Sequence, residues 1–286
     1  MRIGVIGGSG LYEMDGLENV REERVTTPYG DPSDALIIGQ LGDVELVFLP
    51  RHGRRHRFNP SEVNYRANIF ALKQAGVEWI ISVSAVGSLR EDIAPGHIVV
   101  IDQFIDKTFK RENTFFERGL VAHVAFGDPV CGILRGFLLQ AARDAGARVH
   151  DGGTYVCMEG PAFSTRAESN LHRSWGASVI GMTNMPEAKL AREAEMSYAT
   201  LAMATDYDCW HKEHDAVTVE QVIAVLHQNA ALAKQVVRNV IPQIVSYKQP
   251  SPQSSALATA ILTPASSVSA ETRRALAPLI GKYMPV

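Results

Sequence analysis

The chain has 286 residues, with 28 lysines and arginines against 31 aspartates and glutamates, which leaves a formal net charge of −3. This balance argues against a protein built mainly to coat nucleic acid or acidic lipid, and it favours a small-molecule partner. The length suits one large α/β domain with a substantial core, and we expect that domain to span residues 1–243.

Short runs rich in Val and Ile alternate with helical segments, a pattern typical of βαβ units around a buried sheet. The predicted strands cover residues 5–6, 46–49, 79–83, 97–101, 179–180 and 198–204. The predicted amphipathic helices cover residues 64–75, 133–145, 188–194 and 219–240.

Residues 244–286 form a tail that begins with YKQPSPQSSALATA, a stretch poor in aromatic and charged residues. Such a composition predicts a flexible or loosely packed connection. A short helix is expected at residues 271–283. Two hypotheses for the tail stay open, closure over a neighbouring subunit and a disordered appendage.

The segment GVIGGSG at residues 4–10 contains the first predicted strand, which ends in a glycine-rich turn. Backbone N–H groups in such a turn can approach an anion closely, and Ser9 adds a hydroxyl donor. A dinucleotide-binding GxGxxG motif beginning at Gly8 would need glycine at position 13, which is Glu13. A tight turn without a ligand is the alternative.

A basic cluster, RHGRRHR at residues 51–57, directly follows the predicted strand LVFLP. Ligand sites of α/β sheets lie at such strand ends, and arginine offers a planar fork of donors that matches phosphate oxygens. No aromatic stacking platform flanks the cluster, which speaks against nucleic-acid binding. Arg51, with His52 beside it, is therefore the predicted anion ligand, and a solvated surface is the alternative.

A third strand end carries small hydroxyl residues and a glycine, SAVGS at residues 84–88. A plain β-turn would explain this segment taken alone. Because strand carboxyl ends in an open α/β sheet converge on one crevice, three such ends together predict a joint anion site.

Six sequence blocks, in this order, resemble the 5'-methylthioadenosine phosphorylases, a branch of the trimeric purine nucleoside phosphorylase family. The blocks are GGSG, RHGRRH, SAVGSLRE, MEGPAFSTRAES, GMTNMPEAKLARE and ATDYDCW, in register from about residue 3 to about residue 244. The resemblance implies a single α/β domain with a mixed central sheet flanked by helices, assembled as a homotrimer or as a hexamer of paired trimers. It also implies phosphorolysis of 5'-methylthioadenosine to adenine and 5-methylthioribose 1-phosphate, in purine and methionine salvage, with neither metal nor organic cofactor.

The resemblance assigns the phosphate site to Ser9, Arg51, His52, Ser84, Ala85 and Thr183. Some relatives have threonine where this chain has Ser9 and Ser84, so the hydroxyl donor is kept. Phosphate is the nucleophile and needs no protein base. It carries about −1.5 to −2 charge near pH 7, so that Arg51 can position it against an oxocarbenium-like sugar.

The leaving purine gains electron density at its imidazole ring, and a carboxyl group that shares a proton with N7 lowers the barrier. Asp206, which follows the apolar strand LAMAT, is the predicted catalytic group, and Asp208 is predicted to support it at the base. A helix cap or loop carboxylate is the alternative.

Base specificity is predicted from Ser164 and Asp206. Relatives that prefer 6-oxopurines have glutamate and asparagine at these positions, whereas an aspartate oxygen accepts a hydrogen bond from the adenine 6-amine. Phe163 is predicted to stack on the purine, with core packing as its alternative.

The sugar contacts also follow from the resemblance. Met182 is predicted to lie along the ribose, with a core methionine as the alternative. An apolar pocket for the methylthio group is assigned to Val219, Val222 and Ile223, whose spacing would also suit an ordinary buried helix face. His123 matches a residue that is contributed across the trimer interface.

A cytoplasmic location is expected. Cys131, Cys157 and Cys209 form no CxxC pair, which indicates neither a disulfide framework nor a cysteine zinc site, and therefore a reducing compartment. The N-terminus, MRIGVIGGSG, lacks the apolar stretch of a signal peptide, and no segment approaches the roughly 20 apolar residues of a membrane span.

Three rival functions are weighed against phosphorolysis of an aminopurine nucleoside. A nucleosidase that uses water is disfavoured by the predicted phosphate residues, and a 6-oxopurine phosphorylase is disfavoured by Ser164 and Asp206. A binding-only protein is disfavoured because Arg51 and Asp206 are both present. A metal site at Asp208, His211 and His214 is less favoured than a loop of solvated residues, since the chemistry needs no metal.

Overall fold

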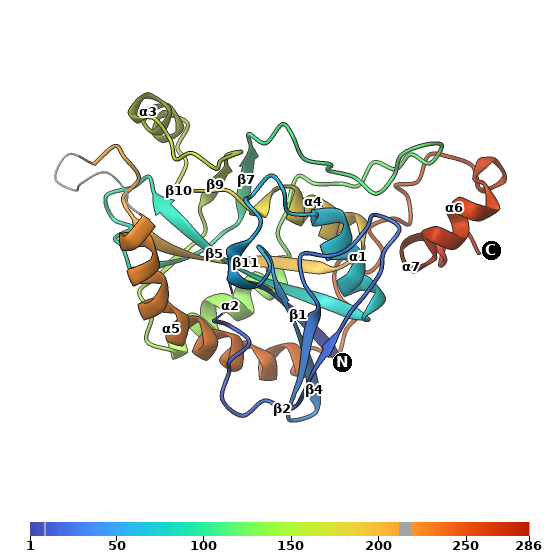
Figure 1. Ribbon diagram of the computed structural model, residues 1–286, viewed down its shortest axis with the longest axis horizontal. Coiled ribbons are helices and arrows are strands. Elements are labelled where there is room, and N and C mark those ends of the chain that lie inside the picture. The colour runs from blue at the N-terminus through green and yellow to red at the C-terminus, as the bar shows by residue number, and fades with distance from the viewer. Residues whose placement is uncertain (9, 212–218, 286) are drawn as a thin grey trace.

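The computed structural model describes the chain except residues 9, 212–218 and 286, and the side chains at 219–224 and 226–228 are also outside the description. The described residues contain a mixed sheet of 11 strands at the centre of the molecule (Figure 1). The main path of the sheet runs β2 (Glu18–Glu23), β3 (Leu36–Leu41), β4 (Val44–Pro50), β1 (Arg2–Gly7), β5 (Val77–Ser88), β10 (Val179–Gly181), β9 (Thr154–Cys157) and β7 (Gln103–Asp106). A branch from β5 adds β11 (Ser197–Asp206), β6 (Ile98–Val100) and β8 (Val149–Asp151).

The long strand β5 organises the sheet. It pairs in parallel with β1, where Val5 lies opposite Ile81, and in parallel with β11, where Tyr198 lies opposite Ile80. Strand β4 pairs in parallel with β1 on its other side. The carboxyl ends of these four strands therefore meet at one edge of the sheet, which is where ligand sites of α/β folds lie.

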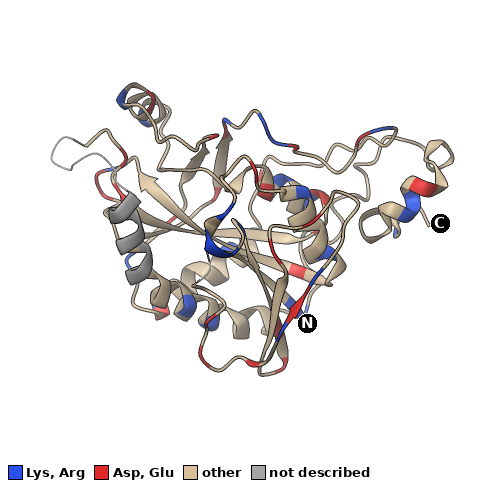
Figure 2. Cartoon of the chain, viewed as in Figure 1, with Lys and Arg blue, Asp and Glu red and all other residues tan. Residues whose placement is uncertain are grey.

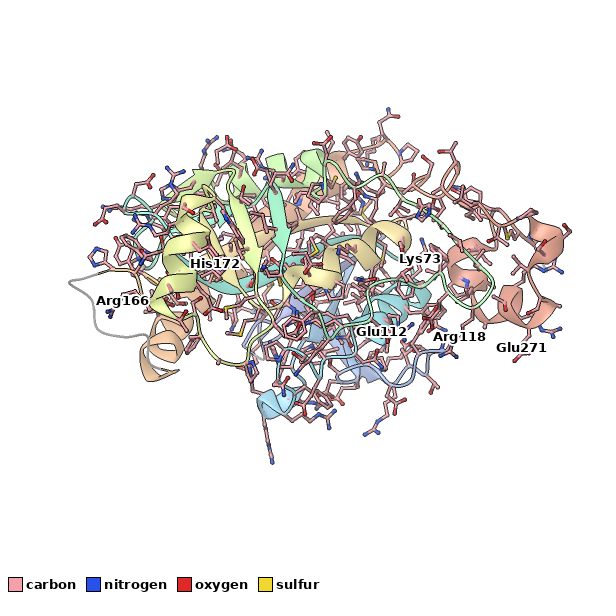
Figure 3. All side chains as sticks on the ribbon, turned by 90° about the horizontal axis from the view of Figure 1, so that it is seen from above. Lys73, Glu112, Arg118, Arg166, His172 and Glu271 are labelled. Atoms are coloured by element: carbon pink, nitrogen blue, oxygen red, sulfur yellow. The ribbon has the colours of Figure 1, made fainter. Side chains whose placement is uncertain are left out.

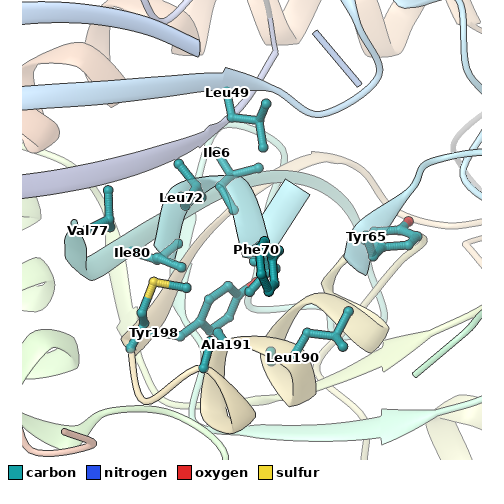
Figure 4. Packing of buried hydrophobic residues seen from close by; sticks show 14 of the residues in the cluster. Ile6, Leu49, Tyr65, Phe70, Leu72, Val77, Ile80, Leu190, Ala191 and Tyr198 are labelled. Carbon is teal, nitrogen blue, oxygen red and sulfur yellow. The ribbon is translucent and has the colours of Figure 1, made fainter. Parts of the chain in front are cut away.

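Helices cover both faces of the sheet, which explains why its central strands are apolar on both sides (Figure 1). Helices α1 (Tyr65–Gln74) and α4 (Asn184–Glu193) cover one face. Helices α2 (Gly132–Asp144) and α5 (Val219–Ser246) cover the other. Figure 4 shows Phe70 and Leu72 of α1 and Leu190 of α4 packed with Ile80 and Tyr198. The predicted α/β class, a mixed sheet flanked by helices, is confirmed.

The predicted strands and helices all occur, whereas strands β2, β3, β7, β8 and β9 and helix α3 (Arg166–Ser174) were not predicted. Strand β2 has the sequence ENVREE and is exposed along its whole length, so it carries no hydrophobic pattern. Figure 2 shows such charged residues spread over the outer strands and helices. Helix α3 is also polar, but its capping box, in which Thr165 and Glu168 bond reciprocally, was visible in the sequence.

The C-terminal tail packs against the body of the domain, which differs from the expected loose connection. Leu257 and Ile280 are fully buried in the same core cluster as α1, and the Ser251 hydroxyl lies 2.6 Å from that of Ser197. Two short helices, α6 (Ala270–Ala275) and α7 (Ala277–Ile280), occupy the region where one helix was expected. A few well-spaced apolar residues thus anchor a segment whose average composition is that of a linker. No helix in the described part of the chain is long and apolar enough to cross a membrane.

Candidate active site

Arg51, directly after the end of β4, is bonded to both neighbouring strands β1 and β5. The Arg51 N–H, directly after β4, donates to the carbonyl of Gly7 at the end of β1 at 3.0 Å. Its Nη1 donates to the carbonyl of Val83 in β5, also at 3.0 Å. The ends of β1 and β4 therefore lie beside Val83, whereas residues 84–88, which were predicted to follow the end of a strand, continue strand β5.

The Arg51 side chain does not offer the free fork that was predicted to hold phosphate. It is 3% exposed, and its Nε and Nη2 donate to the Glu187 carboxylate at 2.7 and 2.9 Å. Nη2 also donates to Ser82 Oγ at 2.7 Å. Burial would lower the pKa of Arg51, but the Glu187 carboxylate outweighs it and raises that pKa. Arg51 is thus a buried ion-pair partner at the sheet edge with most of its donors engaged, and its role as a phosphate ligand stays a prediction.

His52 is neutral near pH 7. Its Nδ1 lies 2.9 Å from the carbonyl of Phe58, and its ring stacks on His56 at a centroid distance of 4.2 Å. Burial and the neighbouring Arg51 charge lower the pKa of His52 to about 4. If Nδ1–H donates to the Phe58 carbonyl, Nε2 is left as an acceptor. The His52 side chain therefore supplies no positive charge to an anion, and its predicted contact with phosphate stays a prediction.

Two predicted phosphate hydroxyls do come together. Ser84 Oγ lies 3.5 Å from Thr183 Oγ1 and 3.2 Å from the Tyr155 hydroxyl. Thr183 precedes helix α4, whose backbone is non-helical at Met185, and the Thr183 side chain makes no capping hydrogen bond. Ala85 follows Ser84 on β5. Ser9, the remaining predicted phosphate residue, lies outside the described residues.

Two carboxyl groups occupy the end of β11. Asp206 accepts a hydrogen bond from Thr205 Oγ1 at 2.7 Å, and burial, with a further contribution from Asp208, raises the pKa of Asp206 to about 6. Burial also raises the pKa of Asp208, which is 5% exposed. Asp208 Oδ2 is buried, and hydrogen bonds from Ser169 and Ser164 to this carboxyl oppose the rise in its pKa. Raised carboxyl pKa values are typical of catalytic sites.

Gly87 on β5 leaves room for this carboxyl pair. A Cβ at position 87 would lie 2.9 Å from Asp206 Oδ1 and 3.3 Å from Asp208 Cβ. We expect Gly87→Ala to displace Asp206 and to lower kcat/KM by about tenfold or more, since small misplacements of catalytic groups are costly. Steady-state kinetics would measure this. Gly136→Ala in α2, where a Cβ would meet nothing within 4 Å, is the matched control, and equal kinetics in the two variants would contradict the expectation.

Ser164 and Phe163 lie on the loop between β9 and α3. Ser164 is buried, and Cys209 Sγ contacts its carbonyl oxygen at 3.2 Å, which ties this loop to the segment that follows β11. Phe163 is 46% exposed, so core packing does not explain it. The structure therefore places Ser164 beside the Asp206–Asp208 segment, as the predicted base pocket requires.

The predicted sugar contacts are described only in part. Met182 packs against the backbone of Gly160, where a Cβ would lie 2.5 Å from the Met182 sulfur. Val219, Val222 and Ile223 fall in the first turns of α5, and their side chains lie outside the described ones.

His123 is exposed on the long segment between β7 and α2, and its N–H donates to the Ala260 carbonyl of the tail at 2.9 Å. That segment runs toward α6 in Figure 1. Figure 3 shows that Glu271 of α6 and His172 of α3 lie at opposite ends of the molecule. No described contact joins His123 to the carboxyl pair.

Sequence reasoning missed four buried residues around the site, namely Glu187, Tyr155, Arg111 and Glu159. Glu187 lies in the motif GMTNMPEAKLARE, but nothing local indicates that it pairs with Arg51, 136 residues away. Among the described residues, no group of three or more His, Cys, Asp or Glu side chains could hold a metal ion, and His214 of the alternative metal site is outside them.

Comparison with known proteins places this site in context. A family model described as the phosphorylase superfamily matches residues 2–242. The chain is 60% identical over 283 residues to an S-methyl-5'-thioadenosine phosphorylase of Geobacter sulfurreducens, covering 99% of each chain. Its structure is similar to a methylthioadenosine phosphorylase from an Antarctic soil metagenomic library, with a TM-score of 0.93, 51% identity, and 97% of this chain and 98% of that one covered. It is also similar to Schistosoma mansoni methylthioadenosine phosphorylase in complex with adenine, with a TM-score of 0.83, 40% identity, and 87% and 93% covered.

Proposed function

The chain belongs to the phosphorylase superfamily, and we propose that it catalyses the phosphorolysis of 5'-methylthioadenosine to adenine and 5-methylthioribose 1-phosphate. Relatives that share 60% of its residues over nearly the full length carry the name of this activity, and the resemblance first noted in the sequence blocks is confirmed. The enzyme is a pentosyltransferase, and the proposed place of its reaction is purine and methionine salvage.

The observation that carries the proposal is the arrangement along β5. Ser84, beside Thr183, and Gly87, beside Asp206, are three residues apart on this strand. At a rise of about 3.3 Å per residue, the Cα atoms of Ser84 and Gly87 are roughly 10 Å apart. That span accommodates a phosphate at one end, a sugar in the middle and the imidazole ring of a purine at the other.

The chemistry follows from this spacing. The C1'–N9 bond breaks with its electrons passing to the purine, while a phosphate oxygen forms the new bond to C1'. Asp206 donates its proton to N7, a general-acid contribution of about 10²- to 10⁴-fold, and Asp208 Oδ2 accepts from the 6-amine. Phosphate is held by the Ser84 and Thr183 hydroxyls and by N–H groups at the strand end. Inorganic phosphate is a co-substrate, and the proposed reaction uses neither metal nor organic cofactor.

Base release tests the proposed function. 5'-Methylthioadenosine, methylthioinosine, adenosine and inosine are each incubated with and without phosphate, and the free base is measured. Adenine release that requires phosphate supports the proposal. Release without phosphate identifies a nucleosidase. This outcome has to be tested because Arg51, the predicted phosphate ligand, is paired with Glu187. Activity confined to the inosine compounds overturns the roles given to Asp206 and Ser164.

A homotrimer, or a hexamer of paired trimers, is part of the proposal, with His123 reaching the site of a neighbouring subunit. The exposed His123 supports it, as do Val121 and Leu262, which are 43% and 62% exposed on the two segments that pair there. Exposed apolar side chains of this kind are typical of protein interfaces.

Replacement of His123 is expected to affect both assembly and binding. His123→Ala should raise KM for 5'-methylthioadenosine, since one wall of the nucleoside site would be lost, by about tenfold if the contact is a hydrogen bond. Light scattering and steady-state kinetics check the two effects. A variant that keeps both its trimer and its kinetics would remove His123 from site and interface alike.

A further inference from the structure

Arg111 is buried beneath the site and connects several loops. Its side chain is 1% exposed. Nη1 donates to the carbonyls of Met182 and Met185, both at 2.6 Å, and lies 3.1 Å from the Tyr65 hydroxyl. Nη2 donates to the Glu159 carbonyl at 2.7 Å, and Nε to the Glu159 carboxylate at 3.3 Å. One guanidinium thus holds the start of α4 with the segment before it, the segment after β9 and the start of α1.

Glu159 makes this arrangement rigid. Its carboxylate accepts hydrogen bonds from the Ser61 hydroxyl and from the N–H groups of Phe109, at 2.7 Å, and Lys110, at 3.3 Å. Burial would raise the pKa of Glu159, but these hydrogen bonds and the Arg111 charge hold it below its usual range. A buried ion pair with this many additional hydrogen bonds has one preferred geometry.

The two segments that Arg111 joins carry different parts of the proposed site. Met182 directly precedes Thr183, on the phosphate and ribose side. Glu159 lies on the segment that leads to Phe163 and Ser164, on the purine side. The close packing of Met182 on Gly160 shows that these segments also touch directly.

We infer that Arg111 is a positioning residue, which sets the distance between the Met182–Thr183 segment and the purine-binding segment at 159–164. This inference rests on the proposed function. Arg111 touches neither nucleoside nor phosphate, and it acts through the carbonyls of Met182 and Glu159. Only arginine suits the position, because lysine presents a single ammonium and cannot span two carbonyls on one segment and a carboxylate on another.

The test compares Arg111→Lys with Arg66→Lys. Arg66 on α1 is a matched control, since it is also largely buried, pairs with Glu117 at 2.9 Å and lies over the Tyr29 ring, but contacts neither site segment. We expect Arg111→Lys to lower kcat for 5'-methylthioadenosine by at least about tenfold, because reacting groups displaced by about an ångström lose much of their rate. Arg66→Lys should stay within about threefold of the wild type.

A second readout separates positioning from a general loss of structure. Adenine alone and inorganic phosphate alone each meet one segment, so calorimetry should give Kd values for Arg111→Lys within about threefold of the wild type, although kcat falls. A folded Arg111→Lys enzyme with unchanged kcat overturns the inference. Weaker binding of both adenine and phosphate, together with a lower Tm, also overturns it, because it indicates a general loss of structure. If Arg111→Lys does not fold, Glu159→Gln decides by the same criteria, with a smaller decrease in kcat expected. If the wild-type enzyme shows no phosphorolysis, the result contradicts the proposed function and not the inference on Arg111. The Kd and Tm values still report on Arg111 in that case.

Discussion

Asp206→Asn is expected to lower kcat/KM for 5'-methylthioadenosine by at least about tenfold. Asp206 sits at the end of β11 beside Gly87, and burial raises its pKa to about 6, so a substantial protonated fraction is available to donate to N7 of the purine. Asparagine keeps the shape but its amide has no acidic proton to transfer. Initial rates of adenine release at several nucleoside concentrations would measure the loss.

The pH dependence follows from the same pKa. The protonated form of Asp206 prevails below about pH 6, so the advantage of the wild type over Asp206→Asn should be complete at low pH and decline as pH rises through that pKa. The ratio of the two kcat/KM values is the relevant quantity, because the ionisation of phosphate affects both enzymes equally. An unchanged kcat/KM in Asp206→Asn would remove Asp206 from the mechanism, and a ratio that stays constant with pH would show that its proton is not the one transferred.

Glu187→Gln is expected to destabilise the protein by about 3–5 kcal/mol, the range found when one partner of a buried ion pair is removed. Glu187 Oε1 accepts from Arg51 Nη2, from Ser82 Oγ and from the Tyr198 hydroxyl, each at 2.9 Å, and Oε2 accepts from Arg51 Nε at 2.7 Å. Glutamine would leave the Arg51 charge uncompensated. The –NH₂ group of the glutamine would also place donor against donor, because it would face either Arg51 Nε–H or the three donors that bond to Oε1 in the wild type.

Denaturant unfolding would measure this loss of stability. Asp92→Asn is the control, since the Arg90–Asp92 pair is more than half exposed and such pairs contribute only about 0–1 kcal/mol. A change below about 1 kcal/mol in Glu187→Gln would show that the buried pair does not hold the sheet edge. A decrease in KM for phosphate in this variant would support Arg51 as a direct phosphate ligand, because its guanidinium would then have been released toward the site.

Local sequence patterns were enough to predict several parts of this protein. Runs of Val and Ile indicated the buried strands β1, β4, β5 and β11, and the rule that strand carboxyl ends converge predicted a joint site for the glycine turn, Arg51 and Ser84. Asp206 was recognisable because a carboxylate directly after an apolar strand is costly without a function or a partner. The sequence blocks identified the family. Strands such as β2 were missed because an exposed, charged strand has no hydrophobic period to detect.

The partners and the charge states of the polar side chains depend on tertiary contacts. The ion pair of Arg51 with Glu187 and the neutral state of His52, which is buried beside Arg51, could not be predicted from local sequence. Arg111 carried no local signal, since the carbonyls it binds belong to residues 71 and 74 positions away. Local spacing specifies which face a residue occupies, whereas the partner and the solvent exposure of a charge depend on contacts between distant segments. Those contacts set both its pKa and its available hydrogen bonds.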